Sequence, residues 1–307
     1  MKILYMGTPD FAVLPLQKLI EDKHEIVGVI TREDKPKGRG MKVVMTPVKE
    51  YALTQSIPVF QPTTLKDNAI AELLSELAPE LIVVVAYGKI LPKYILDFPK
   101  FGCINLHGSL LPKYRGSAPI QHAVLNGDKV SGVSTMLMNE GMDTGDILMM
   151  REVAIEGDDT SESLFDKLSV VGSELLTETV ALHSEGKLTP IAQDESEATY
   201  APPILKENAK ICWNTETDKI LNLIRGSYSW PIAYTDSEIG RIKVYKAKRG
   251  DMSGDAGKVL ALTNEGIEIG TLDGSVLVTF FQVESGKRMS PVDYFRGHPS
   301  IVGSFLK

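Results

Sequence analysis

The chain has 307 residues, of which 43% are hydrophobic and 24% charged; this balance is typical of folded proteins and excludes a wholly disordered chain. Its length predicts about two domains. Lys and Arg total 33 and Asp and Glu total 40, so the net charge of −7 excludes a uniformly basic surface for nucleic acid but not a local basic patch. The two cysteines, Cys103 and Cys212, form no CxxC pair, which excludes a disulfide framework and a zinc knuckle and suits a reducing compartment.

The amino-terminal segment is typical of a strand, a turn and a helix. Residues Lys2–Met6 are apolar and end at Gly7, and apolar side chains recur at helical spacing over 10–21. The turn, MGTPDFA, has the place of a dinucleotide fingerprint but lacks the second and third glycines of GxGxxG, which disfavours a nicotinamide-dependent dehydrogenase. It also interrupts the apolar start of the chain, so we expect no signal peptide. Since no run of about 18 apolar residues exists, we expect a soluble, cytoplasmic protein.

A basic loop follows the second predicted strand, residues 25–30. Residues 32–44, REDKPKGRGMKVV, contain five basic side chains among proline and glycine and show no periodicity. One interpretation is a mobile, solvated surface loop. The other is an arm that grips phosphates, in which Arg39, flanked by glycines, and its neighbours Lys37 and Lys42 make the contacts.

Two buried strands are predicted at 80–86 and 102–106. Strands that alternate with helices indicate βαβ units and a parallel sheet. Asn105 and His107 lie two positions apart at the carboxyl end of the second strand, so their side chains share a face if the strand continues. Ligands of open α/β sheets bind at this end of the strands, and an amide beside an imidazole can stabilise an oxyanion. A turn-forming asparagine and a structural histidine are the alternative.

The polar sequence continues through an irregular loop and a glycine-rich connection. Residues 108–119, GSLLPKYRGSAP, offer free backbone groups to a ligand. Residues 139–147, NEGMDTGDI, join two apolar strands; their aspartates are either turn formers or a source of a carboxylate that charges the imidazole and accepts a proton. Spacing does not choose between Asp143 and Asp146. The histidines have no metal-ligand spacing and no GxSxG elbow exists, so we predict neither a metal site nor a serine hydrolase.

The pattern changes after about residue 190. A long helix is predicted over 161–185, and a charged, proline-containing linker over 191–208. The short strands of 209–307, separated by turn residues, favour a small β-barrel or sandwich. One of these strands carries a cluster of basic residues that either forms a stripe for nucleic acid or protects an edge strand. This cluster comprises Arg241, Lys243, Lys246, Lys248 and Arg249.

Together, MGTPDFA, the Asn105/His107 pair, HGSLLPKYRG and GMDTGDI resemble the 10-formyltetrahydrofolate-dependent formyltransferase family. The resemblance also includes GRGMK and YGKILP and covers essentially the full chain. It implies a Rossmann-like α/β formyltransferase domain with a mainly parallel sheet at 1–190, the linker at 191–208, and a small OB-like β-barrel that contacts tRNA at 209–307.

The resemblance implies the roles of the candidate residues as well. Asn105, His107 and Asp143 would be catalytic, and the preference for Asp143 over Asp146 rests on the family alone. Arg39, with its neighbours, and the basic cluster of the second domain would bind tRNA. The expected folate contacts are Tyr87, Gly88, Ile90, Leu91, Ser109, Leu110, Leu111 and Pro112.

Within the family, the chain is most similar to members that act on tRNA. It would transfer the formyl group of 10-formyltetrahydrofolate to the α-amino group of initiator methionyl-tRNA in translation initiation, as a monomer and without a metal. Two other classes stay open. One is a folate-dependent enzyme that acts on a small amine or hydrolyses formyl-folate, and the other is a noncatalytic RNA-binding protein with a relic α/β domain.

Overall fold

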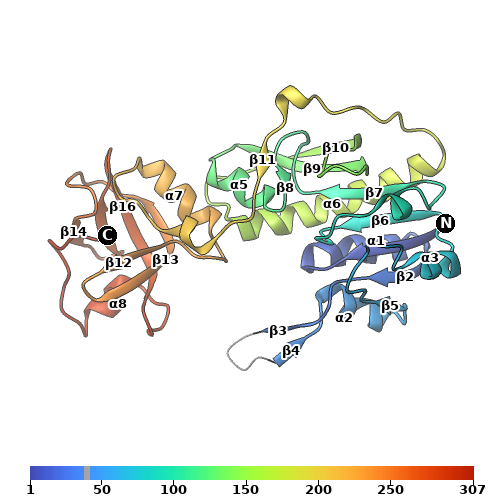
Figure 1. Ribbon diagram of the computed structural model, residues 1–307. Coiled ribbons are helices and arrows are strands. Elements are labelled where there is room, and N and C mark those ends of the chain that lie inside the picture. The colour runs from blue at the N-terminus through green and yellow to red at the C-terminus, as the bar shows by residue number, and fades with distance from the viewer. Residues whose placement is uncertain (38–41) are drawn as a thin grey trace. The chain divides into compact units, whose positions relative to one another are not determined.

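The structure, a computed structural model, describes residues 1–37 and 42–307. Its contacts divide the chain into two compact units with interleaved boundaries (Figure 1). The first unit comprises Met1–Pro119, Val130–Ala154 and Phe165–Pro202. The second comprises Ile120–Lys129, Ile155–Leu164 and Pro203–Lys307. The domain boundaries drawn from the sequence stay a prediction.

A seven-stranded sheet in the order β10-β9-β7-β6-β1-β2-β5 forms the centre of the first unit. Five strands, from β5 to β7, run parallel, and β9 and β10 join antiparallel. The strands are β1 (Lys2–Gly7), β2 (Glu25–Ile30), β5 (Val59–Phe60), β6 (Leu81–Val85), β7 (Cys103–His107), β9 (Val130–Leu137) and β10 (Asp146–Ala154).

Helices cover both faces of this sheet. Every residue of β6, LIVVV, is buried, as a strand between two helical layers requires. On one face Leu4, Ile82 and Cys103 pack in a cluster with residues of α3 and α4. On the other face Leu106 of β7 lies against Gly172 of α6. The helices are α1 (Val13–Glu21), which follows the 3-10 turn η1 (Asp10–Ala12), α2 (Pro47–Thr54), α3 (Ala71–Leu77), α4 (Lys93–Leu96) and most of α6 (Ser161–Ser184).

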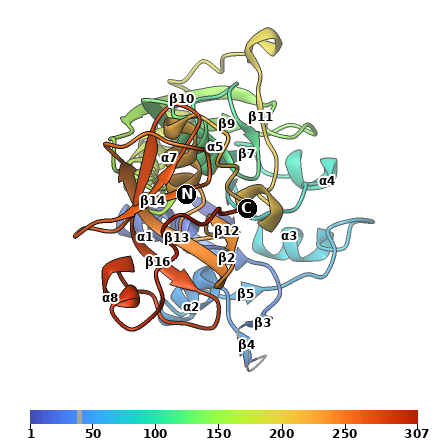
Figure 2. The same ribbon diagram turned by 90° about the vertical axis from the view of Figure 1, so that its left-hand side faces the viewer.

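Two short strand pairs complete the first unit. β3 (Lys35–Lys37) and β4 (Lys42–Val44) pair antiparallel and extend away from the sheet (Figures 1 and 2). The sequence shows no periodicity there because three-residue strands are too short to produce an alternation. β8 (Arg115–Gly116) pairs in parallel with β11 (Tyr200–Ala201), which follows the 3-10 turn η2 (Glu195–Glu197).

An antiparallel sheet that closes on itself forms the second unit. Its strands lie in the order β12-β13-β16-β15-β14. They are β12 (Tyr234–Ser237), β13 (Gly240–Arg249), β14 (Val259–Leu262), β15 (Ile267–Gly270) and β16 (Ser275–Val283). The carboxyl-terminal segment joins the two outer strands, because Lys307 exchanges backbone hydrogen bonds with Asp236 on β12 while Phe305 bridges Lys258, next to β14. This closure produces the barrel-like domain that short strands and turns predict.

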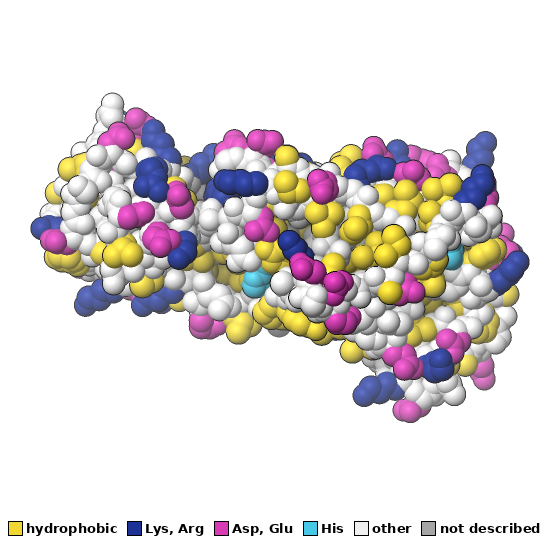
Figure 3. Space-filling view, turned by 90° about the horizontal axis from the view of Figure 1, so that it is seen from above, with side chains coloured by type: hydrophobic (Ala, Val, Ile, Leu, Met, Phe, Trp, Pro, Cys, Tyr) yellow, Lys and Arg dark blue, Asp and Glu magenta, His cyan; other side chains and the backbone are white. Residues whose placement is uncertain are grey.

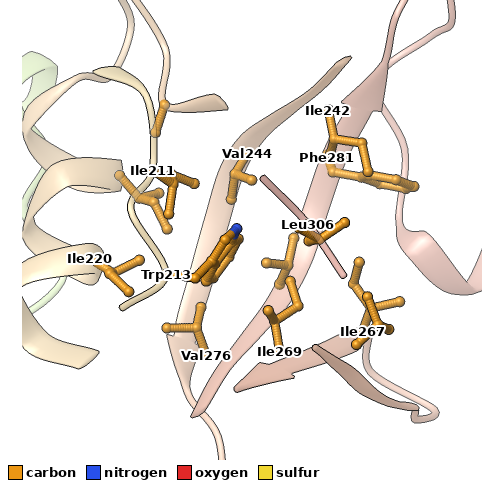
Figure 4. Packing of buried hydrophobic residues seen from close by; sticks show 14 of the residues in the cluster. Ile211, Trp213, Ile220, Ile242, Val244, Ile267, Ile269, Val276, Phe281 and Leu306 are labelled. Atoms are coloured by element: carbon orange, nitrogen blue, oxygen red, sulfur yellow. The ribbon is translucent and has the colours of Figure 1, made fainter. Parts of the chain in front are cut away.

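The interior of the barrel is an apolar core (Figure 4). Trp213 lies inside it, and its indole Nε1 donates to Thr235 Oγ1 at 3.0 Å, so its one polar atom is satisfied. Ile220 and Ile224 line the buried side of α7. The helices of this unit are α5 (Pro119–Leu125), the 3-10 turn η3 (Lys206–Ala209), α7 (Thr217–Gly226) and α8 (Pro291–Phe295). Among the helices described, none is long and apolar enough to cross a membrane.

Candidate active site

The carboxyl end of β7 carries the predicted pair of polar side chains. Alternation along the strand places Asn105 and His107 on the same face as Cys103, whose thiol lies 3.7 Å from the carbonyl of Ile95 in α4. Both side chains are almost buried, with exposed fractions of 8% for Asn105 and 6% for His107. The strand therefore holds an amide and an imidazole side by side at the end where ligands of such sheets bind.

The imidazole of His107 is oriented by the loop that follows it. Its Nε2 lies 2.9 Å from the carbonyl oxygen of Tyr114. Since a carbonyl can only accept, Nε2 carries the hydrogen of this bond. Nδ1 then faces Oδ2 of Asp143 at 3.8 Å. Nδ1 is thus the ring nitrogen that lies beside a carboxylate.

Asp143 reaches this position from the connection between β9 and β10. Its backbone is left-handed, with φ of 55°, and its Oδ2 accepts a hydrogen bond of 2.8 Å from the backbone N–H of Gly116. Gly145 is required two residues later, because a Cβ there would collide with the carbonyl oxygen of Leu137. Asp146 is exposed in β10. The geometry thus places Asp143 beside His107.

The loop after His107 is held against β9. Ser134 Oγ donates to the carbonyl of Ser109 at 2.7 Å and accepts from the backbone N–H of Leu111 at 3.0 Å. Ser109 Oγ donates to the carbonyl of Lys113 at 2.6 Å. Leu111 joins an apolar cluster with β9 and β10, and its peptide bond to Pro112 is cis. The hydrogen bonds of Ser109 and Ser134 therefore fix the backbone of this loop, which carries the predicted folate contacts from Ser109 through Leu110 to Pro112.

The other predicted folate segment leaves β6, the neighbour of β7. Ile90 is 75% exposed, whereas Leu91 and Tyr87 are buried in the core beneath α3 and α4. Burial raises the pKa of Tyr87 to about 12, and its hydroxyl has no hydrogen-bond partner among residues 1–37 and 42–307. Gly88 adopts φ of 79°, and its carbonyl accepts from Arg32. Of this segment, Ile90 presents the apolar side chain that a ligand can reach.

Comparison with known proteins finds a separate match for each end of the chain. A family profile described as formyl transferase matches residues 1–180, and one described as formyl transferase, C-terminal domain, matches 203–299. A methionyl-tRNA formyltransferase of Alkaliphilus oremlandii is 45% identical over 308 residues, covering 100% of this chain and 99% of that protein. The protein of the same name from Caldanaerobacter subterraneus is 46% identical over 310 residues, covering all of both. The chain belongs to the formyltransferase family.

Solved structures of other formyltransferases and related proteins share the fold. An N-formyltransferase from Helicobacter canadensis in complex with folinic acid and dTDP-3-aminofucose superposes with a TM-score of 0.68 at 20% identity, over 91% of this chain and 99% of that one. HypX from Aquifex aeolicus in complex with tetrahydrofolic acid gives 0.67 at 19% identity, over 96% of this chain and 47% of that one. The predicted fold class, a Rossmann-like formyltransferase domain followed by a small barrel-like domain, is confirmed.

The basic candidates of this formyltransferase lie in both units. Arg39 falls outside the described residues, and Lys37 and Lys42 are paired in register across β3 and β4. On β13, register shifts between Val244 and Ala247 change the alternation, so the exposed positions are 241, 243, 246, 248 and 249. On the face shown in Figure 3, basic and acidic side chains are interspersed across the molecule.

Acidic neighbours already occupy part of this basic cluster. Arg241 pairs with Asp236 at 2.9 Å, Arg249 pairs with Asp218 at 2.9 Å, and Lys248 pairs with Glu265. Within the part of the chain that the structure describes, Lys243 and Lys246 have no acidic partner. These two lysines are therefore the members of the cluster whose charge is available to a ligand.

Sequence reasoning missed the polar residues that hold the site together from outside. Arg115 is fully buried, and its guanidinium makes a bidentate ion pair with Glu195 at 2.8 Å. Gln193 accepts a hydrogen bond from Arg115, and Thr199 accepts one from the backbone N–H of its neighbour Tyr114. These partners come from the segment that reads as a linker, so only the need of a buried arginine for a partner could have signalled them. No group of side chains suited to a metal ion occurs among the described residues.

Proposed function

We propose that this chain transfers the formyl group of 10-formyltetrahydrofolate to the α-amino group of the methionine esterified to initiator tRNA, and so acts in translation initiation. The observation that carries this proposal is full-length similarity, at 45–46% identity, to proteins named methionyl-tRNA formyltransferase. Both domains of the family are present. The grouping of Asn105, His107 and Asp143 supplies the chemistry that the reaction needs.

The three side chains divide the chemistry of acyl transfer. 10-Formyltetrahydrofolate supplies the formyl group as a substrate. As the neutral amine adds to the formyl carbon, the formyl oxygen gains negative charge, and the amide N–H of Asn105 donates to it. Because Nε2 of His107 is bonded to the carbonyl of Tyr114, only protonated Nδ1 can be the second donor. Collapse of this tetrahedral adduct restores the carbonyl and breaks the bond between the formyl carbon and N10 of the folate. Asp143 supports the charge of the imidazolium and accepts the proton that the amine loses, which passes to the leaving N10 directly or through water.

The folate substrate would lie between two loops at neighbouring strand ends. β6 and β7 pair from Ile82 and Cys103 to Val85 and Leu106, so the segments that follow them start side by side. Exposed Ile90 suits an apolar contact with the pterin or its ring substituent. The fixed backbone from Ser109 to Pro112 suits hydrogen bonds to its polar edge. We assign the cosubstrate to this position.

The tRNA would be held by basic residues of both units. We assign phosphate contacts to Lys243 and Lys246 first, because neighbouring carboxylates do not neutralise them, and to Arg241, Lys248 and Arg249 with them. Lys37, Arg39 and Lys42 complete the assignment. In this proposal, residues 1–190 form the catalytic domain, 191–208 the linker and 209–307 the tRNA-binding domain. The protein acts as a monomer in the cytoplasm.

A single assay tests the function. The full chain is incubated with 10-formyltetrahydrofolate and methionylated initiator tRNA, and formylmethionine is measured after release from the tRNA. We expect formylation that requires both substrates. Parallel reactions contain aminosugars, small amines or water as acceptors. Turnover on one of these together with no turnover on the charged tRNA would assign the chain to another branch of the family, and no turnover at all would leave an RNA-binding protein.

A further inference from the structure

The side-chain amide of Gln193 joins the two loops that hold the imidazole and the carboxylate. Its Nε2 donates to the carbonyl of Asp143 at 2.9 Å and to that of Gly145 at 2.7 Å. Its Oε1 accepts from Nε of Arg115 at 3.0 Å and from Nη2 at 2.9 Å. The amide therefore uses both of its donor hydrogens and both of its acceptor sites in one place.

The Gln193 amide forms a bridge between Arg115 and the backbone of Asp143, and each end of this bridge lies next to residues that hold His107 or the carboxylate of Asp143. Arg115 stands between Tyr114, whose carbonyl holds His107, and Gly116, whose N–H holds the carboxylate of Asp143. Its own guanidinium is fixed by Glu195 and is completely buried. The arginine is thus a rigid support, and the amide transmits its position to the connection that carries the carboxylate.

We propose that Gln193 is a positioning residue that holds the carboxylate of Asp143 at its distance from the imidazole. Asp143 adopts a left-handed backbone, with φ of 55°, which is uncommon outside glycine and which surrounding contacts can stabilise. The two hydrogen bonds from Gln193 end on the carbonyls of Asp143 and Gly145 and so support that conformation. Without them the carboxylate keeps only the N–H of Gly116 to hold it, although no atom of Gln193 need touch a substrate.

Gln193→Glu tests the donor half of the bridge separately from the acceptor half. The variant keeps its oxygen toward Arg115 as an added ion pair, but it replaces the donor by an oxygen that repels the carbonyls of Asp143 and Gly145. We expect kcat for formylation to fall about 10- to 100-fold, because displacement of a reacting group by about 1 Å has effects of this size. KM for both substrates and the melting temperature should change little. Gln55→Glu, the same change at an exposed site, is the matched control.

A double-variant cycle separates positioning from general damage. If Gln193 acts through Asp143, then Gln193→Glu should add no further loss of kcat to Asp143→Asn. Losses that multiply, or an unchanged kcat in the single variant, would overturn the proposal. Should Gln193→Glu fail to fold, Gln193→Met removes the same donors without adding charge, and the same cycle applies.

This inference rests on the proposed formyl transfer, but one readout needs no substrate. The backbone N–H of Gly116 donates to the carboxylate of Asp143, so its hydrogen exchange reports where that carboxylate lies. In Gln193→Glu we expect exchange of this amide to accelerate at least tenfold, while the amide of Arg115, bonded to the carbonyl of Thr199, keeps its rate. An unchanged Gly116 rate would refute positioning, whereas absent formylation by the unaltered chain would refute only the function.

Discussion

The bond from His107 to the carbonyl of Tyr114 determines which ring nitrogen is left for the proposed chemistry. Nε2 is engaged at 2.9 Å, and Nδ1 faces Asp143. A histidine held in this way donates from Nδ1 only when both ring nitrogens carry a proton. Asn105 is different because its amide donates at any pH. In the proposed mechanism the two residues therefore stabilise the same developing charge by means that can be separated experimentally.

Asn105→Ala should depress turnover and leave binding of tRNA nearly unchanged. Loss of one oxyanion donor costs about 10²–10³ in kcat, or about 2.7–4 kcal/mol. The measurement is steady-state formylation together with an equilibrium titration of the charged tRNA. Asn214→Ala, at an exposed position of the second unit, is the control. A variant that loses only tRNA affinity would make Asn105 a contact residue and remove it from the chemistry.

The two cysteines should differ sharply in reactivity. Cys103 is buried in β7, where desolvation raises the pKa of its thiol to about 12, whereas Cys212 is exposed. At a pH of about 8 the thiolate of Cys103 is therefore scarce and inaccessible. We expect one thiol to react with iodoacetamide in the native protein and two after unfolding, as counted by mass spectrometry. Labelling of native Cys212→Ser would show that β7 opens and that the site is not rigid.

At the scale of elements, the sequence predicts those strands and helices whose positions depend on a local pattern of apolar residues. Continuous apolar residues predict β6, and the structure forms it at Leu81–Val85; the helical pattern over 161–185 becomes α6 at Ser161–Ser184. On β13 simple alternation accounts for exposed Arg241 and Lys243 but fails at Tyr245, which is buried. A register shift there, which depends on pairing with β16, brings Lys246 and Lys248 to the exposed side.

In the candidate site, too, local pattern places some residues and not others. Asn105 and His107 belong to one strand, so alternation alone places them together. Asp143 is delivered by a connection whose left-handed turn has no periodic signal, and residue spacing leaves Asp146 equivalent to it. Gln193 lies 50 residues from Asp143 in the chain, so its hydrogen bond to that residue has no local trace in the sequence. Long-range polar pairing is the part of the site that the sequence does not disclose.

The closing segment of the barrel should be essential to the stability of the second unit. Leu306 is 6% exposed and packs in the core, while its backbone N–H donates to the carbonyl of Gly257. Leu306→Ala should lower the free energy of unfolding by about 2–5 kcal/mol through reduced burial and a cavity. Val302→Ala, at a position 46% exposed, should change it by about 0.5 kcal/mol or less. Denaturant titrations measure both. Equal effects would mean that the segment does not close the barrel.

At the scale of the whole molecule, an acidic chain is proposed to bind a polyanion. The net charge of −7 opposes nonspecific attraction to RNA, so binding must depend on local groups. Ion pairs already neutralise Arg241, Lys248 and Arg249 in part. This leaves the stripe on β13 weaker than its five basic residues indicate and concentrates its usable charge at two of them.

Removal of that usable charge should flatten the dependence of tRNA binding on salt. Each neutralised phosphate that releases a counterion contributes roughly 0.7–0.9 to the slope of log K against log salt concentration. We expect Lys243→Gln with Lys246→Gln to reduce the slope by about that amount for each phosphate that these lysines no longer neutralise, measured from titrations at several salt concentrations. The control removes two exposed, ion-paired lysines, Lys18 and Lys219, and so matches the change in net charge. If both double variants shift the slope equally, the total charge governs binding and β13 is not the surface that binds tRNA.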